Sequence, residues 1–499
     1  MASCSRIEIL AFLFALIGII CTVFSSTVHA EDRLVPVNCW FSRQPGLTVG
    51  CFHFSVAEDR GAPGSKMLIL PVVIVYAPQP DGEEPILYVP GGPGDSGWID
   101  EAHINFWWNF IRESAWLRAR DVILMDPRGT GMAAPLMDCS SLHIGDGELL
   151  GLGNDFTAIN RSVAATNQSC LKELTHQGFA ITQYRSRVMV EDLHELLAAL
   201  HRPKWNLYGL SYGTRVALTY MRRYPEDLRS VILDSVLPPE VKFSEDSAWV
   251  LNRALETFFS GCARSARCRK HGDMRALVTM LFREWNAHPF QRMMKDPYYD
   301  HDFMLKLTGN DIINYIIGRL YNRSDIEELP KDLADIAGGA PKAHERLAET
   351  LLNDTVRSPA FGDAAGQSVF CLEEWPSNDS ARARANFEKY PLLADASKFE
   401  DGCKSWVIGQ NDPEESQAVE SDIPALVLAG HYDPVTPPEY ARLAVARLHH
   451  AYYFEFPGAG HDVLSNEPCG DVLAEKFLHD LETPPTDACL GKVKEPDFQ

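Results

Sequence analysis

Short runs of branched apolar residues alternate with amphipathic stretches in the first half of the chain. The apolar runs predict buried strands over residues 67–76, 86–89, 121–125, 205–208 and 230–233. Apolar residues at helical spacing predict helices over 186–200 and 214–224. Pro71 interrupts the first run and predicts an edge position or a break in that strand. The alternation as a whole favours an α/β fold, with a mostly parallel sheet and helices on both faces.

The same alternation returns near residue 421, after a long region of a different character. Strands are predicted over 425–429 and 452–456, and helices over 438–448 and 472–481. In between, the apolar spacing predicts only helices, over 248–259, 274–285, 311–320 and 343–352. We interpret residues 31–240 and 421–499 as two parts of one sheet domain, with residues 241–420 inserted as a helical cap. The alternative is an independent domain on a linker, but neither join is rich in Pro, Gly or Ser.

The first thirty residues have the composition of a secretory signal peptide. An apolar run of about 16 residues follows Arg6, and Val28-His29-Ala30 carries the small residues that a signal peptidase accepts. We expect cleavage after Ala30, a secreted or periplasmic mature protein (residues 1–30 removed), and no stable membrane insertion afterwards. The alternative is an uncleaved membrane anchor, which the run disfavours because a bilayer needs roughly 20 residues.

Cysteine usage agrees with export. Of 12 cysteines, Cys4 and Cys21 lie in the leader, which leaves an even ten, as in disulfide-bonded exported proteins. In chain order these ten form five neighbouring pairs: 39–51, 139–170, 262–268, 371–403 and 469–489. The order alone does not prove which cysteines are joined. No His or Cys cluster has the spacing of a zinc site, so we expect no metal and no cofactor.

The charge balance narrows the range of partners. The chain has 68 acidic and 46 basic residues, a formal net charge of -22. Such an excess of negative charge opposes contact with phosphate backbones, so we expect no nucleic-acid partner. With 45% hydrophobic and 23% charged residues, the composition is that of a globular protein with a large core.

A G-x-S-x-G pentapeptide, Gly209-Leu210-Ser211-Tyr212-Gly213, lies between a predicted strand and a predicted helix. In that context the turn is tight enough to hold the serine in a strained conformation and to expose its Oγ above the sheet edge. The flanking glycines leave room for the strand and the helix to approach each other. The pentapeptide therefore predicts that Ser211 is a nucleophile and not an ordinary turn serine.

A serine nucleophile needs a base and an acid to orient that base. His461 lies in a loop of small residues directly after the last predicted strand, where it can reach the serine. Asp433 follows the strand that ends near residue 429. The chain order Ser211, Asp433, His461 is the one expected when all three follow strands of an α/β sheet. A surface histidine and an acid in a plain turn are the alternatives for these two positions.

The oxyanion of an acyl-transfer intermediate needs two backbone donors. The amide of Tyr212, next to the nucleophile, is one candidate. The other is Gly91 or Gly92 in Pro90-Gly91-Gly92-Pro93-Gly94, where the missing Cβ lets the backbone approach a substrate. A glycine loop can also bind phosphate, but this loop has neither the Lys-Ser/Thr nor the G-x-G-x-x-G pattern of phosphate sites.

Four blocks of sequence resemble the tripeptidyl/prolyl aminopeptidase branch of the α/β-hydrolases: residues 90–97, 126–131, 205–215 and 431–438. The resemblance implies an α/β-hydrolase fold and a D-x-R-G-x-G turn at Asp126 and Arg128 that braces the loops beneath the site. Prolyl iminopeptidases usually have His where Pro90 stands, so the chain is closer to the tripeptidyl relatives. The small iminopeptidases often carry Glu directly after the triad acid, where this chain has Pro434.

The resemblance implies a serine exopeptidase that acts on peptides with a free N-terminus. Related enzymes often show Cys-x-Glu in the cap, which favours Glu373 in Cys371-Leu372-Glu373-Glu374 as the group that binds the substrate amine. A solvated acidic pair is the alternative reading of these two glutamates. The nearest alternative function is a carboxylesterase or lipase-like hydrolase with the same triad. A hydrolase-shaped binding protein is a further alternative, but it requires the loss of a triad member, and all three candidates are present in the sequence.

Overall fold

The structure is a computed structural model that describes residues 33–78, 83–139, 149–296, 302–355, 361–400, 402–406 and 412–499. The predicted signal peptide, residues 1–30, lies outside these residues. Within the described ranges no helix is both long enough and apolar enough to cross a membrane.

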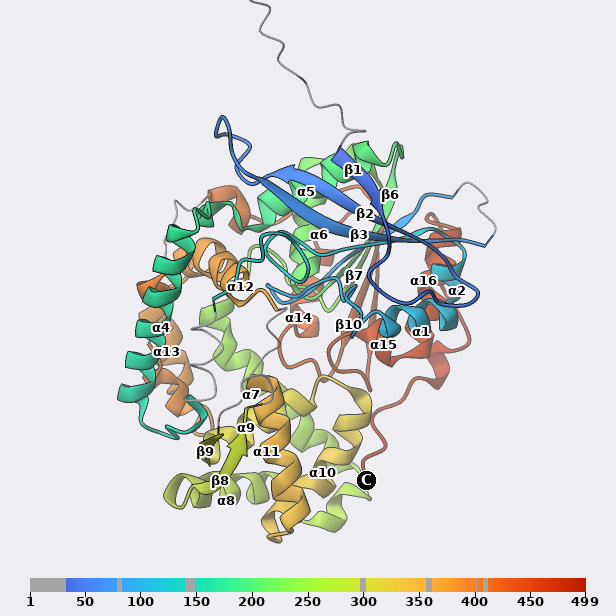
Figure 1. Cartoon of the computed structure of the whole chain (residues 1–499). Coiled ribbons are helices and arrows are strands. Elements are labelled where there is room, and N and C mark those ends of the chain that lie inside the picture. The colour runs from blue at the N-terminus through green and yellow to red at the C-terminus, as the bar shows by residue number, and fades with distance from the viewer. Residues whose placement is uncertain are drawn as a thin grey trace, which may run out of the picture.

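A nine-stranded sheet forms the centre of the molecule (Figure 1), in the order β1-β2-β3-β5-β4-β6-β7-β10-β11. The strands are β1 (Leu34–Val37), β2 (Thr48–Ala57), β3 (Met67–Tyr76), β4 (Ile86–Val89), β5 (Val122–Met125), β6 (Trp205–Leu210), β7 (Leu228–Asp234), β10 (Ala425–Gly430) and β11 (Ala451–Phe456). The first three pair antiparallel, β3 meets β5 antiparallel, and every pair from β5 to β11 is parallel. The predicted mostly parallel sheet is confirmed, and the strands β1 and β2 extend it beyond the prediction.

Helices cover both faces of this sheet. One face carries α5 (Ser186–Ala199), α6 (Tyr212–Arg223) and α14 (Pro438–Val445); the other carries α1 (Asn105–Glu113), α2 (Ala115–Arg118) and α16 (Pro468–His479). Successive side chains of a strand point to opposite faces. In β6, Leu207 accordingly packs in the first layer and Tyr208 in the second. This alternation gives the sheet two apolar cores.

The prediction from Pro71 is wrong, because β3 runs unbroken through that residue and is not an edge strand. Pro71 pairs with His53 of β2, and the ladder to β5 begins one residue later, at Val72. The Pro71 carbonyl accepts from the Asp126 amide, so the main-chain groups of Pro71 face the β5 side, beyond the end of that ladder. The missing N–H of the proline therefore removes no bond of the long β2–β3 ladder.

The region between β7 and β10 is mainly helical (Figure 1). Its helices are α7 (Phe243–Arg264), α8 (Met274–Ala287), α9 (Gly309–Arg319), α10 (Arg323–Ala337), α11 (Pro341–Thr355), α12 (Asp363–Val369) and α13 (Ser380–Phe387). They bury a core of their own, which includes Phe258, Ile316 and Leu347. The expectation of helices alone is wrong at one place, where β8 (Phe290–Lys295) and β9 (Asp302–Leu307) form a hairpin. Phe303, Leu305 and Leu307 have the two-residue spacing of a half-buried strand.

Five disulfides join the ten cysteines of the described residues, and they are the neighbouring pairs 39–51, 139–170, 262–268, 371–403 and 469–489. One of them, Cys371–Cys403, lies in the same small apolar cluster as Cys139 and Cys170. That cluster also includes residues of α4 (Phe156–His176). Asn167 of α4 donates to the Gly402 carbonyl at 3.0 Å, so α4 packs against the later part of the cap region, residues 241–420.

Candidate active site

Ser211 occupies the sharp turn that the pentapeptide predicts. It lies between β6 and α6 and has φ 56° and ψ −123°, a conformation that is unfavourable for a residue with a Cβ. A Cβ on Gly209 would lie 2.6 Å from the Gly213 carbonyl oxygen, and a Cβ on Gly213 would lie 2.1 Å from that of Val89. Both positions therefore need glycine because strand and helix backbones approach closely there.

The glycine loop after β4 lies beside this turn. A Cβ on Gly91 would lie 3.2 Å from the Cβ of Ser211, and Gly92 has φ 102°, which only glycine adopts without strain. Tyr212 opens α6, so its main-chain N–H belongs to the first turn and has no partner within the helix. Of the three residues predicted to form the oxyanion hole, Gly91 and Tyr212 thus lie next to Ser211, and Gly92 follows Gly91 in the same loop.

His461 and Asp433 form a buried pair. His461 Nδ1 lies 2.8 Å from Asp433 Oδ2, and the two residues are 8% and 0% exposed. The carboxylate also accepts from the amides of Val435 and Thr436 and from the Thr436 hydroxyl, each at 2.8 Å. Burial alone would raise the pKa of Asp433, but the charge and hydrogen bond of His461 and these amides outweigh it, so the pKa is lowered. Asp433 is therefore held as a carboxylate that orients the imidazole.

The electrostatics of His461 follow from the same contact. Burial disfavours the imidazolium, but the charge and hydrogen bond of Asp433 outweigh burial and raise the pKa of His461. Because Nδ1 faces the carboxylate, Nε2 is the nitrogen left for proton exchange with another group. A neighbour from the cap region, Tyr321, stacks at an angle on this ring with centroids 5.0 Å apart.

Ser211, Asp433 and His461 follow β6, β10 and β11, whose carboxyl ends lie at one edge of the parallel sheet. This is the edge at which open α/β sheets bind ligands. The Ser211 amide donates to the Asp234 carbonyl at 2.9 Å, and the carboxylate of the same aspartate accepts from the Val463 amide at 2.9 Å. The Ser211 turn and the loop that carries His461 are therefore neighbours.

Glu373 is fully buried and lies in a network of charged groups between the cap region and the sheet domain. Its carboxylate accepts from the Ser186 amide, from Ser186 Oγ at 2.8 Å, and from Arg215 Nε at 3.1 Å. The Tyr212 hydroxyl lies 2.8 Å from the same Ser186 Oγ. Glu373 is thus connected to α6 at Arg215, one turn after Ser211, and it is not the solvated surface acid of the alternative reading.

The network contains more acidic than basic paired side chains. Arg215 also pairs with Glu374, and Arg185 pairs with Glu415 at 2.8 Å. Three carboxylates, Glu373, Glu374 and Glu415, therefore face two guanidiniums, Arg185 and Arg215. Burial and the charge of Glu373 raise the pKa of Glu415 to about 7. The sequence pointed to Glu373 and Glu374 but missed their partners, because ion pairs over such separations leave no local pattern.

The cap region also covers the glycine loop directly. The Gly362 amide donates to the Gly94 carbonyl at 3.1 Å, and a Cβ on Gly366 would lie 2.4 Å from the Pro93 carbonyl oxygen. The next segment of the chain, Phe370–Glu374, carries Glu373. The acidic network and the predicted oxyanion hole are therefore linked through one short stretch of backbone.

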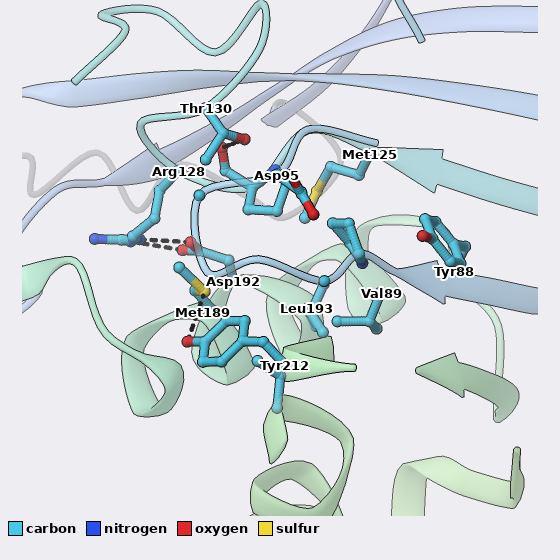
Figure 2. A pocket seen from close by; sticks show the side chains of 15 residues that line it. Tyr88, Val89, Asp95, Met125, Arg128, Thr130, Met189, Asp192, Leu193 and Tyr212 are labelled. Carbon is cyan, nitrogen blue, oxygen red and sulfur yellow. Dashed lines mark hydrogen bonds and ion pairs between the residues drawn. The ribbon is translucent and has the colours of Figure 1, made fainter. Parts of the chain in front are cut away.

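Asp126 and Arg128 brace the loops around the site. Asp126 accepts from the amides of Gly97 and Met132, both at 2.7 Å, while Arg128 makes a two-pronged ion pair with Asp192, both contacts 2.7 Å. Figure 2 shows this pair among the residues that line a pocket, whose lining also includes Gly91 and Gly94. Arg128 and Asp192 are both completely buried, so the pair is a buried scaffold, as the resemblance implied.

The fold and the arrangement of the site are typical of an α/β hydrolase, and comparison with known proteins agrees. Residues 84–468 match the family described as alpha/beta hydrolase fold, and the chain belongs to that family. The predicted fold class is thus confirmed.

Three relatives are informative. A protein of Escherichia coli named as a hydrolase, YuaR, is 25% identical over 376 residues, 70% of this chain and 68% of its own. Tripeptidyl aminopeptidase of Streptomyces coelicolor is 23% identical over 430 residues, 79% of this chain and 73% of its own. Serine protease Hip1 of Mycobacterium tuberculosis is 23% identical over 515 aligned positions, which cover 96% of this chain and 95% of its own. These names confirm the resemblance to the peptidase branch, and the chain is a serine hydrolase.

Proposed function

We propose that the chain is an exported serine exopeptidase that releases N-terminal residues or short peptides from peptides through an acyl-enzyme on Ser211. The observation that carries the proposal is the strained Ser211 turn at the same sheet edge as the buried His461–Asp433 pair. The five disulfides support an oxidising compartment and hence export.

In the proposed reaction Ser211 Oγ attacks the scissile carbonyl carbon while its proton passes to His461 Nε2. Asp433 stabilises the imidazolium, and the amides of Tyr212 and of Gly91 or Gly92 donate to the oxyanion. Collapse of the intermediate breaks the C–N bond, and His461 returns the proton to the departing amine. Water, activated by the same histidine, then hydrolyses the ester and restores the serine.

An exopeptidase must also bind the protonated amine of its substrate. A buried ammonium is costly unless carboxylates compensate its charge. The network around Glu373 supports this role, since three acidic side chains pair there with two guanidiniums, and Arg215, which pairs with Glu373, lies one helical turn after Ser211. We propose that Glu373 supplies the negative charge that the substrate amine requires.

Hydrolysis of a matched substrate set tests the proposal. The set is one short peptide with a chromogenic amide leaving group, its N-acetyl counterpart, and a small acyl ester. We expect the free-amine peptide to be cleaved with a kcat/KM at least tenfold above that of the acetylated peptide, the factor that about 1.4 kcal/mol of amine binding gives. If acetylation has no effect and the ester is the best substrate, the esterase alternative replaces the exopeptidase.

A further inference from the structure

Two residues at the end of β7, Asp234 and Ser235, contact all three segments that carry the proposed triad. We propose that they are positioning residues that hold the nucleophile turn, the histidine loop and the strand before Asp433 in register. This inference rests on the proposed function of Ser211, His461 and Asp433. Both residues are completely buried.

The first contact is to the nucleophile. The main-chain oxygen of Asp234 accepts from the Ser211 amide at 2.9 Å. Because Ser211 is in a strained conformation, its position depends on hydrogen bonds from the surrounding structure. Asp234 provides one of these at the nucleophile itself.

The second contact is to the loop that carries His461. The carboxylate of Asp234 accepts from the amides of Val463 and Leu464 at 2.9 and 2.8 Å, and Ser235 Oγ accepts from the Asp462 amide at 2.9 Å. Three consecutive amides directly after His461 are thus held by two side chains of one strand end. The loop has little freedom to move the imidazole relative to Ser211.

The third contact is to β10, the strand that leads to Asp433. The Ser235 amide donates to the Leu428 carbonyl at 3.0 Å. Ser235 has φ 59° and Asp462 has φ 64°, so both adopt the left-handed conformation that disfavours a residue with a Cβ. With Ser211, they are three of the five non-glycine residues with positive φ in the described ranges. Strain concentrated at one point indicates that this junction fixes geometry for catalysis.

The proposal predicts a loss in the chemical step and not in substrate binding. Asp234→Ala removes both acceptors and leaves two loop amides without a partner. A displacement of about 1 Å at the reacting groups costs on the order of 100-fold in rate. In Asp234→Asn the amide oxygen still accepts one bond, so the loss should be intermediate, about tenfold.

The test measures kcat, KM and the rate of labelling by a fluorophosphonate for the wild type, Asp234→Ala, Asp234→Asn and Ser235→Ala. We expect kcat and the labelling rate to fall together, about 100-fold in Asp234→Ala, about tenfold in Asp234→Asn and severalfold in Ser235→Ala. KM should change less than about twofold in each variant. Asp332→Asn is the matched control, a buried cap aspartate that accepts from the Tyr315 hydroxyl at 2.9 Å. It should lose stability and keep kcat.

The outcomes separate the two proposals. If the label does not attach to Ser211 of the wild type, the proposed function fails. If the wild type is labelled at Ser211 and folded Asp234→Asn and Ser235→Ala react at the wild-type rate, only the positioning proposal is overturned. An equal fall of kcat in Asp332→Asn also overturns it, because the loss would then follow general stability. Asp234→Asn and Ser235→Ala keep the test valid if Asp234→Ala does not fold.

Discussion

The strand-end site and the acidic network of the cap region are built in different ways. At the strand ends, Asp433 and Asp234 accept hydrogen bonds from main-chain amides that lie close in sequence to the proposed catalytic residues Asp433 and His461. The network instead consists of ion pairs such as Arg215–Glu373 and Arg185–Glu415, whose members are far apart in the chain. We infer that backbone geometry of the sheet sets the chemistry and that the contact between cap and sheet sets the preference for a substrate.

The largest expected effect tests the strand-end site. Ser211→Ala removes the nucleophile and should lower kcat by at least about 10⁴-fold on peptide and ester alike. The fold should remain, because within the described residues Ser211 Oγ forms no hydrogen bond that alanine would lose, and alanine keeps the Cβ. Turnover with a chromogenic peptide and a thermal melt measure the two properties. A variant with wild-type turnover contradicts the triad.

The second prediction compares how both regions respond to pH. Burial, followed by the charge of Asp462, raises the pKa of Asp234 to about 8, and burial raises that of Glu415 to about 7. The ordinary pKa values are near 4, so the folded state holds these protons more tightly than the unfolded state. Protonation of Asp234 and Glu415 therefore stabilises the folded state fully below pH 4, and this stabilisation is lost as the pH rises through 7 to 8.

Urea unfolding from pH 5 to pH 8 checks this prediction. In the pH range where the carboxyl is protonated in the folded state but ionised in the unfolded state, each group lowers the free energy of unfolding by about 1.4 kcal/mol for every unit that the pH rises. Asp234→Asn and Glu415→Gln should each make the dependence of the unfolding free energy on pH less steep, because each variant removes the contribution of one titrating group. Identical slopes in the wild type and both variants would show that neither group titrates in this range.

The third prediction concerns the disulfide beside the network. Cys371–Cys403 closes a loop with a sequence separation of 32, and its removal by paired Ser substitutions should cost about 2–4 kcal/mol of unfolding free energy. It should also lower the preference for a free amine, because Glu373 lies two residues from Cys371. Removal of Cys39–Cys51, at the first strands, serves as the control and should affect stability alone. An unchanged amine preference in the first variant would separate the bridge from substrate selection.

The smallest expected effect separates the network from the strand-end site. Glu373→Gln should reduce the ratio of free-amine to N-acetyl cleavage by about 10- to 100-fold, while ester hydrolysis falls little. Glu58→Gln is a matched control, since Glu58 is also buried and accepts from an amide, that of Ala180, and a hydroxyl, that of Tyr184. A similar loss in both variants would assign the effect to general stability.

The sequence was informative where a function depends on local backbone. The pentapeptide around Ser211 and the strands before Asp433 and His461 have apolar and glycine patterns that extend over a few residues. The pattern could not find Asp234, Ser235 or Arg215, because their roles depend on contacts between segments that only the folded chain brings together. The β8–β9 hairpin was missed for a related reason, since a short alternating run inside a helical region is ambiguous.

The most direct test of the central claim is to trap the acyl-enzyme. A chromogenic peptide with a free N-terminus is mixed with the enzyme, quenched in acid within one turnover, and the protein is digested and mapped by mass spectrometry. We predict that the peptide containing Ser211 gains the mass of the released N-terminal fragment less one water, which is the mass of the acyl group, and that the N-acetyl substrate gives much less adduct. An adduct on another residue, or turnover with no adduct on Ser211 under conditions where acylation outruns hydrolysis, would contradict the account.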